Sequence, residues 1–234
     1  MSRRNVLITG ANRGIGLEYV RQLLARGDHV IATARHPAQA HDLNRLVAEH
    51  PGRLHVFPLD VMDPKAEAEV ARELPLVLGD EPLHLLINNA GLLHSGERFG
   101  HVPAANLEDS FRTNAMGPFL LAQAIAPRLA DGAKVANMTS QLGSIANTTR
   151  FGTPTYAIGK AALNMVTRLL AAALADRRIA VVSLHPGWVQ TDMGGAQAPL
   201  APQQSVAGLL RVIDGLDMAR SGSFLDWQGE TLPW

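Results

Sequence analysis

The sequence predicts a doubly wound α/β fold, in which a parallel sheet is covered by helices on both faces of a single domain spanning residues 1–234. Short apolar runs alternate with longer segments that have helical spacing of apolar residues. The apolar runs contain few polar residues, as expected for strands that are buried on both faces. The first run leads directly into a glycine-rich turn and a helical segment.

The predicted strands are the apolar runs at residues 6–9, 29–34, 54–58, 83–87, 135–138, 179–184 and 223–225. The predicted helices lie between them, at residues 15–25, 38–49, 63–78, 107–129, 155–175 and 205–216. Gly27 ends the first helix, and Asp63 is the N-cap of the third, with Pro64 at its first position. Pro75 is expected to end or kink that third helix. Ligands of such folds bind beyond the carboxyl ends of the strands, so these ends are where a site is expected.

Composition and charge exclude several classes of protein. The 21 basic and 21 acidic side chains give no net charge, so the basic excess of a general nucleic-acid binder is missing. The absence of cysteine excludes disulfides, thiolate metal sites and a cysteine nucleophile. The nine histidines show no metal-ligand spacing, and no metal is expected. No stretch is long and apolar enough for a membrane span or a signal-peptide core, so a soluble cytoplasmic protein is expected.

The glycine-rich turn after the first predicted strand indicates a dinucleotide site. Glycines let the chain turn sharply and approach a pyrophosphate, and the helix N-terminus offers free N–H groups. The alternative is an ordinary glycine-rich turn, but the context between a first strand and a first helix favours the dinucleotide. The residues expected to contact it in this turn are Gly10, Asn12, Arg13, Gly14, Ile15 and Gly16.

The end of the second predicted strand indicates NADP(H). An NAD site carries an acidic residue there for the ribose 2′-hydroxyl, whereas an NADP site carries a cation for the 2′-phosphate. This sequence has Arg35 and no carboxylate at that place, and Arg13 supplies a second guanidinium. The alternative is that both arginines are solvated surface residues.

Further cofactor contacts are expected at the ends of the later strands. Asp60 could accept a hydrogen bond from the adenine amino group or could cap a helix. Thr191 follows a turn made by Pro186 and Gly187 and could meet the nicotinamide amide. His185 is interpreted as a structural histidine beside this turn. The full set of contacts expected at strand ends is Asp60, Val61, Asn89, Ala90, Gly91, Pro186, Gly187, Val189 and Thr191.

Tyr156 and Lys160 form the candidate catalytic pair, because residues four apart lie on one face of a helix. A nearby ammonium and an oxidised nicotinamide would lower the pKa of the phenol, which could then exchange a proton with the substrate oxygen. Ser140 follows the fifth predicted strand and could hold the same oxygen.

Asn114 lies four residues before Pro118 inside a predicted helix. Proline has no N–H, so the carbonyl of Asn114 is left free to hold a water that links Lys160 to solvent. The alternative is a merely structural kink.

Together these motifs resemble the short-chain dehydrogenase/reductase family, in the family's order from the first strand to the sixth. The resemblance implies a Rossmann fold with a seven-stranded parallel sheet, Asp60 at the adenine, and Asn88 as a sheet-stabilising residue. It also implies an Asn-Ser-Tyr-Lys tetrad, here Asn114, Ser140, Tyr156 and Lys160, in which Tyr156 and Lys160 also contact the nicotinamide ribose of the cofactor. Homodimers or homotetramers joined through the helices at 107–129 and 155–175 are expected on the same basis.

The segments at residues 185–195 and 221–234 resemble a narrower branch, the C-factor/sniffer-like carbonyl reductases. The sequence differs from the family at two places, a longer gap between Ser140 and Tyr156 and Gly159 in place of a frequent serine. The gap bears on substrate choice, and Gly159 costs about 1 kcal/mol of helix stability relative to alanine.

The expected function is therefore reversible hydride transfer between NADP(H) and the carbonyl of an aldehyde or ketone. Three alternatives stay open: a cofactor-binding regulatory or signalling protein, a sugar-nucleotide epimerase and a structural oligomer. No nucleic-acid or membrane partner is expected. The substrate pocket is expected to be mostly apolar and to contain Leu92, Leu93, Leu142, Phe151, Trp188 and Met193.

Overall fold

The computed structural model describes residues 3–234, and its centre is a seven-stranded parallel sheet. The strand order β3-β2-β1-β4-β5-β6-β7 reverses direction between β1 and β4, which is the doubly wound arrangement predicted from the sequence. The strands are β1 (Asn5–Ile8), β2 (His29–Ala34), β3 (Leu54–Pro58), β4 (Leu83–Asn88), β5 (Leu129–Met138), β6 (Ala180–His185) and β7 (Ser223–Asp226).

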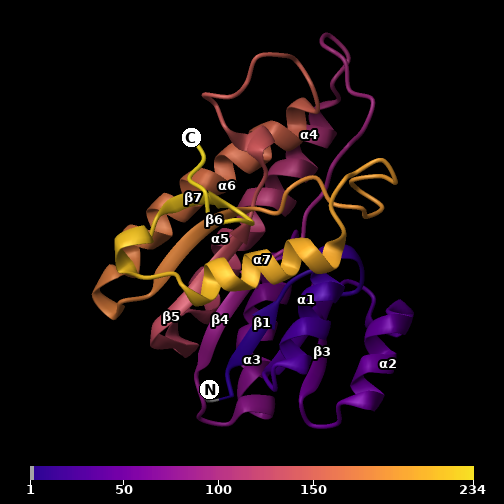
Figure 1. The fold of residues 1–234 in the computed structure, drawn as a ribbon. Helices are drawn as coiled ribbons and strands as arrows, with labels where there is room; N and C mark the ends of the chain where they lie inside the picture. The colour runs from indigo at the N-terminus through magenta and orange to yellow at the C-terminus, as the bar shows by residue number, and fades with distance from the viewer. Residues whose placement is uncertain (1–2) are drawn as a thin grey trace.

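Helices cover both faces of the sheet, and each layer closes its own hydrophobic core. The helices of one layer are α1 (Gly14–Ala25), α2 (His41–Glu49) and α7 (Pro202–Asp214). The opposite layer contains α3 (Pro64–Leu78), α4 (Ala104–Phe111), α5 (Gly117–Ile125) and α6 (Pro154–Ala173). In Figure 1, α1 and α7 lie in front of the sheet, and the loops after β4 and β5 project beyond α4 at the top. The predicted Rossmann architecture is confirmed.

The prediction of one continuous helix at residues 107–129 is wrong, because both of its ends differ and its middle is not α-helical. Its place is taken by α4, a π-helical turn at Arg112–Met116, α5 and a short 3-10 turn at Ala126–Arg128. Leu129 already belongs to β5, where it pairs with Leu83, and the register then shifts before Leu85 pairs with Lys134. Leu129 is buried, and a buried leucine fits the apolar pattern of a helix as well as that of a strand. Only its pairing with β4 shows that it belongs to a strand.

Of the two outcomes expected at Pro75, the end of the helix is excluded, since α3 continues to Leu78, where the sequence predicts its end. It ends at Gly79, whose φ of 58° lies in the left-handed region that favours glycine. The predicted N-cap is confirmed: the Asp63 side chain accepts from the N–H of Lys65 at 3.0 Å, and Pro64 occupies the first position.

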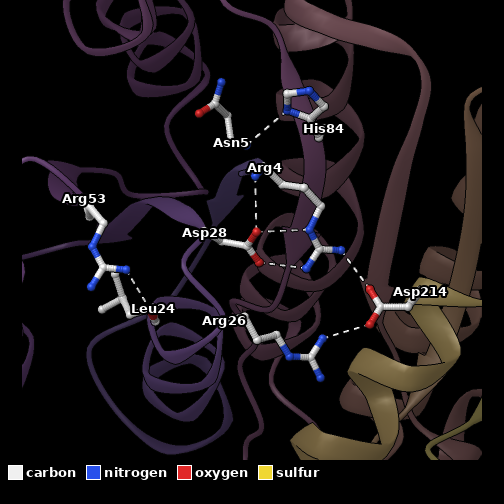
Figure 2. Close-up of polar contacts among 8 residues, drawn as sticks. All are labelled: Arg4, Asn5, Leu24, Arg26, Asp28, Arg53, His84 and Asp214. Carbon is white, nitrogen blue, oxygen red and sulfur yellow. Dashed lines mark hydrogen bonds and ion pairs between the residues drawn. The ribbon is translucent and has the colours of Figure 1, made fainter. Parts of the chain in front are cut away.

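Charged side chains join the amino-terminal edge of the sheet to the ends of α1 and α7 (Figure 2). Arg4 binds Asp28 through two nitrogens, at 3.2 and 2.7 Å, and reaches Asp214 at 2.8 Å. Arg26 donates to the other oxygen of Asp214 at 2.8 Å. Lys134 donates to the carbonyl of Asp214 at 2.8 Å, near the end of α7. These contacts hold the amino-terminal edge of the sheet against α1 and α7, and the site is expected at the opposite edge, where the strands end.

Within residues 3–234, no helix has the length and apolar character needed to cross a membrane. The expected cytoplasmic location stays a prediction.

Candidate active site

A cleft of about 480 Å³ opens at the carboxyl ends of the strands. It is lined by the glycine turn, by the segments that follow β2, β3, β4 and β6, and by α6. Sixteen of the eighteen expected cofactor contacts line it; Gly187 and Val189 do not. The sixteen are Gly10, Asn12, Arg13, Gly14, Ile15, Gly16, Arg35, Asp60, Val61, Asn89, Ala90, Gly91, Tyr156, Lys160, Pro186 and Thr191.

Several lining residues were not predicted from the sequence, namely Ala34, His36, Gln39, Leu59, Met62, Thr113, Met138, Thr139 and Asp192. Most of them adjoin a predicted residue at a strand end. Extending each predicted strand-end residue by one or two positions would have found all of them except Gln39 and Thr113.

The glycine turn forms a cradle that side chains would fill. Gly10 has a φ of 63°, and a Cβ at Gly16 would lie 2.2 Å from the Gly10 carbonyl oxygen and 2.6 Å from Asn89 Nδ2. Helix α1 begins without a side-chain cap and without an acidic residue in its first turn. Its first N–H groups and positive dipole end therefore suit a phosphate group, and the residues present fit a dinucleotide.

The cradle is joined to the end of β4 by Thr9. Its hydroxyl accepts from the N–H groups of Asn89 and Ala90, both at 3.0 Å. In return, Asn89 Nδ2 donates to the carbonyls of Thr9 and Gly10, each at 3.0 Å. The two segments that would meet the cofactor are thus held as one unit.

The two arginines expected at the 2′-phosphate are not arranged alike. Arg35 is exposed and lines the cleft. Arg13 instead forms an ion pair with Asp192 at 2.8 Å, in which both side chains are largely exposed. Asp192 belongs to the segment after β6, so this pair bridges the glycine turn and that segment.

Asp60 does not cap a helix, because the N-cap of α3 is Asp63. Its Oδ1 accepts from the N–H of Met62 at 3.0 Å and so folds the turn that follows β3. The side chain lines the cleft, so contact with adenine stays a prediction.

Tyr156 and Lys160 lie in the first turns of α6, and both are buried in the wall of the cleft, at 8% and 3% exposure. Lys160 Nζ lies 5.6 Å from the centre of the Tyr156 ring and donates to the carbonyl of Met138 at 2.7 Å. Ser140 lies two residues beyond the end of β5. Its hydroxyl contacts Tyr156 and also accepts from the N–H of Leu142 at 3.1 Å. The structure therefore brings the serine, tyrosine and lysine together.

Burial controls the protonation of this pair. It raises the pKa of Tyr156 to about 12, and the hydrogen bond with Ser140 only partly opposes it. It lowers the pKa of Lys160 to about 7. The phenol therefore keeps its proton at neutral pH. The lowering of the tyrosine pKa expected from the ammonium together with an oxidised nicotinamide stays a prediction.

Asn114 lies in the π-helical turn and is fully buried. There the N–H of Gly117 donates to the carbonyl of Arg112, five residues back, just before Pro118 interrupts the bonding with its missing N–H. The distortion expected at Asn114 is observed. The side chain of Asn114 is bonded to the backbone of Leu92 and to Ser110, and the water expected on its carbonyl stays a prediction.

Gly159 lets α6 pack closely against α4 and the π-helical turn. A Cβ there would lie 3.1 Å from the Ser110 carbonyl oxygen and 3.2 Å from Asn114 Cβ. The long segment between Ser140 and Tyr156 is held in turn by the last residues, since Ser144 donates to the carbonyl of Pro233 at 2.7 Å and Ala146 N to that of Trp234 at 2.8 Å.

Asn88 lies behind the cleft in a buried polar row. Its Nδ2 donates to Asn137 Oδ1 at 2.8 Å, and Asn137 Nδ2 donates to the hydroxyl of Thr167 at 2.9 Å. Ser183 donates to the same hydroxyl at 2.8 Å. These bonds join β4, β5 and β6 to α6, which agrees with the sheet-stabilising role expected for Asn88.

The expected substrate residues are spread more widely than the cleft. Leu92 and Met193 line it, whereas Leu93, Leu142, Phe151 and Trp188 do not. Phe151 instead packs edge-to-face on Phe99, with ring centres 5.6 Å apart. Trp188 donates to the carbonyl of Gly194 at 2.7 Å. A substrate contact of these four residues stays a prediction.

His185 lies beside the turn after β6, and burial lowers its pKa to about 4, so it is uncharged at neutral pH. Among residues 3–234, no three His, Asp or Glu side chains gather in a way that could hold a metal ion.

Comparisons with known proteins identify the relatives of this chain. The sequence pattern described as short chain dehydrogenase matches residues 4–200. The C-signal protein of Myxococcus xanthus is 46% identical over 155 residues, covering 65% of this chain and 93% of that protein. The carbonyl reductase Sniffer of D. melanogaster has a similar structure, with a TM-score of 0.95, 35% identity and coverage of 100% of both chains. The NADPH-bound carbonyl reductase from chicken fatty liver has a TM-score of 0.94 and 37% identity, also with 100% coverage of both chains.

Proposed function

The chain belongs to the short-chain dehydrogenase family of oxidoreductases, and from this premise we propose that it is an NADP(H)-dependent carbonyl reductase. The reaction is reversible hydride transfer between the cofactor and the carbonyl of an aldehyde or ketone. One observation carries the proposal: Tyr156 and Lys160 line the cleft formed by the glycine turn, and the hydroxyl of Ser140 contacts Tyr156.

The cofactor is held by residues of the cleft. The glycine turn and the N-terminus of α1 suit the pyrophosphate, and Asp60 is available to the adenine. When bound, NADPH supplies the hydride that adds to the carbonyl carbon. The guanidinium of Arg35 would favour the 2′-phosphate of NADP, and the similar reductase from chicken fatty liver carries NADPH.

The chain's own residues manage the proton. Because burial keeps the phenol of Tyr156 protonated at neutral pH, Tyr156 is the donor to the carbonyl oxygen during reduction. The hydroxyl of Ser140 contacts Tyr156 and would hold the same oxygen. In its protonated form, Lys160 stabilises the phenolate left behind. Asn114 fixes Leu92 in the wall of the cleft.

The test is reduction of a panel of aldehydes and ketones by the purified chain, followed by the loss of NADPH absorbance. We expect turnover on apolar carbonyls by the wild type. Tyr156→Phe should lower kcat by about a thousandfold or more, because the proton donor is lost, while the Kd of NADPH changes little. Full activity in Tyr156→Phe would contradict the assignment, and activity confined to highly charged carbonyls would contradict the apolar substrate.

A second candidate is a regulatory or signalling protein that binds the cofactor with little turnover. The likeness that favours it is the 46% identity to the C-signal protein. A wild-type chain that binds NADPH tightly but reduces no carbonyl of the panel would favour this candidate.

We also propose that the chain forms a homodimer through α4 and α6. Both helices expose large apolar side chains, which a second copy of the same face would cover, namely Leu107, Phe111, Ile158, Met165 and Leu169. Sedimentation equilibrium of the wild type and of Met165→Glu tests this, and a wild type that stays monomeric would contradict it.

A further inference from the structure

Helix α6, which carries Tyr156 and Lys160, begins without a cap of its own. Its N-cap position is Thr153, whose side chain makes no capping hydrogen bond and whose φ of 41° is unusual for a β-branched residue. Pro154 occupies the first position and has no N–H to donate. The first backbone donor of the helix is therefore the N–H of Thr155, directly before Tyr156.

A distant carboxylate takes the place of the missing cap. Glu97 lies in the segment after β4, and its Oε2 accepts from the N–H of Thr155 at 3.3 Å. Both of its carboxylate oxygens lie 3.0 Å from the hydroxyl of Thr155. Asn106 Nδ2 donates to the same carboxylate at 3.3 Å, which ties the start of α4 to this point. A negative group at a helix N-terminus also complements the helix dipole.

Thr155 is held from its other side as well. The hydroxyl of Ser110 donates to the carbonyl of Thr155 at 2.9 Å and accepts from Asn114 Nδ2 at 3.0 Å. Thr155 is only 1% exposed, and Ser110 and Asn114 are fully buried. The residue before Tyr156 is thus fixed at its N–H, its hydroxyl and its carbonyl at once.

We propose that Glu97 is a positioning residue, which caps α6 from a neighbouring loop and so holds the Tyr156 hydroxyl in line with the substrate oxygen. This inference rests on the proposed carbonyl reduction. Phe99 and Phe151 form a second link between the same two loops, with ring centres 5.6 Å apart. The segment after β4 therefore has two roles: its Leu92 forms part of the cleft wall, and its Glu97 holds the start of α6.

The chemistry of the contacts explains why a carboxylate suits this place. Every group that meets Glu97 here is a donor: one backbone N–H, one hydroxyl and one amide nitrogen. A glutamine has one acceptor oxygen and would keep part of the bonding, whereas an alanine would leave the buried Thr155 donors without a partner.

The experiment compares the full chain with Glu97→Ala, Glu97→Gln, Thr155→Val and the double variant Glu97→Ala/Thr155→Val. We expect Glu97→Ala to lower kcat about ten- to a hundredfold, because misplacement of a reacting group is costly. The Kd of NADPH, measured by fluorescence, should stay within about twofold, and Glu97→Gln should recover most of the turnover. The double variant should lose little more than Glu97→Ala alone, since both changes break the same contact.

A readout without turnover accompanies the kinetics. Amide exchange at residues 155–157 should be about tenfold faster in Glu97→Ala than in the wild type, because the first turn of α6 opens more easily. Glu69→Ala is the matched control, since Glu69 is an exposed glutamate on α3 whose only partner among the described residues is Arg72 at 4.0 Å. It should change neither kcat nor exchange at α6.

Unchanged exchange at residues 155–157 in Glu97→Ala would overturn the inference whatever the activity. A kcat within about twofold of the wild type, or a parallel loss of NADPH affinity, would overturn the positioning role. A wild-type chain that binds NADPH and reduces no carbonyl would instead overturn the proposed function, and with it the role of Glu97 in turnover, while the exchange data would still decide whether Glu97 caps α6.

Discussion

The side-chain amide of Asn114 forms two hydrogen bonds with a single residue, Leu92. Its Oδ1 accepts from the N–H of Leu92 at 2.9 Å, and its Nδ2 donates to the carbonyl of Leu92 at 2.8 Å. Gly91 lies beside this contact: a Cβ there would lie 3.3 Å from Asn114 Oδ1 and 3.5 Å from Lys160 Nζ. The fully buried Asn114 therefore fixes the cleft wall next to the lysine rather than touching Tyr156.

Asn114→Ala should reduce both stability and turnover. The change removes the partners of the Leu92 N–H and carbonyl, which costs about 2 kcal/mol of unfolding free energy. It should also lower kcat about tenfold, since Leu92 lines the cleft and loses its fixed position. The backbone carbonyl of Asn114 stays in place, so the variant tests the side chain alone. Urea unfolding and steady-state kinetics with NADPH measure the two effects.

Asn44→Ala is the matched control, because Asn44 is an exposed amide that donates once, to the carbonyl of Pro37 at 2.9 Å. It should change stability by less than about 0.5 kcal/mol and leave kcat unaltered. An Asn114→Ala variant with wild-type kcat would show that the position of Leu92 does not matter for turnover.

Arg35→Ala should remove most of the preference for NADPH over NADH. Arg35 lines the cleft, and no ion pair or hydrogen bond engages its guanidinium among residues 3–234, so it is available to a phosphate. Loss of a charge-assisted contact should raise the Kd of NADPH about ten- to a hundredfold and leave that of NADH nearly unchanged. Fluorescence titration with both cofactors measures the ratio.

Arg13→Ala should have a smaller effect on this ratio, because Arg13 is already paired with Asp192 at 2.8 Å. Arg45→Ala changes the same charge on α2, where Arg45 pairs with Asp42 at 2.9 Å, and should leave the ratio unaltered. An unchanged ratio in Arg35→Ala would refute the role of Arg35 in cofactor choice.

The strands and the glycine turn could be predicted from the sequence because their signals are local. Apolar runs such as that of β6 are buried on both faces, and the glycines of the turn are required by backbone conformation and close packing, as at Gly10 and Gly16. The pair Tyr156 and Lys160 is equally local, since helical spacing alone places both side chains on one face.

The features that could not be predicted depend on contacts between distant segments. Leu129 joins a strand because Leu83 pairs with it, which no periodicity shows. Glu97 meets Thr155 across 58 positions of sequence, and neither residue belongs to a motif. The high pKa of Tyr156 comes from burial by several elements at once, so the sequence indicated the neighbouring lysine but not the burial that raises this pKa.

Glu67 on α3 is an acidic side chain buried to 2% exposure, and its Oε1 has no hydrogen-bond partner among the described residues. Burial, together with the neighbouring Asp63 carboxylate, raises its pKa from 4.5 to about 8. Below pH 4.5 the folded and unfolded chains both hold the proton. Between 4.5 and about 8 only the folded chain does, so this group makes the fold less stable as the pH rises through that window.

Glu67→Gln should abolish this pH dependence. Glutamine keeps the shape of the protonated side chain and cannot ionise, so the variant should match the wild type near pH 4.5 and exceed its unfolding free energy by about 2 kcal/mol near pH 8. Urea unfolding across that range measures the difference. Glu69→Gln, an exposed change on the same helix, should show no such trend. A constant difference between Glu67→Gln and wild type at every pH would mean that folding does not shift the pKa of Glu67.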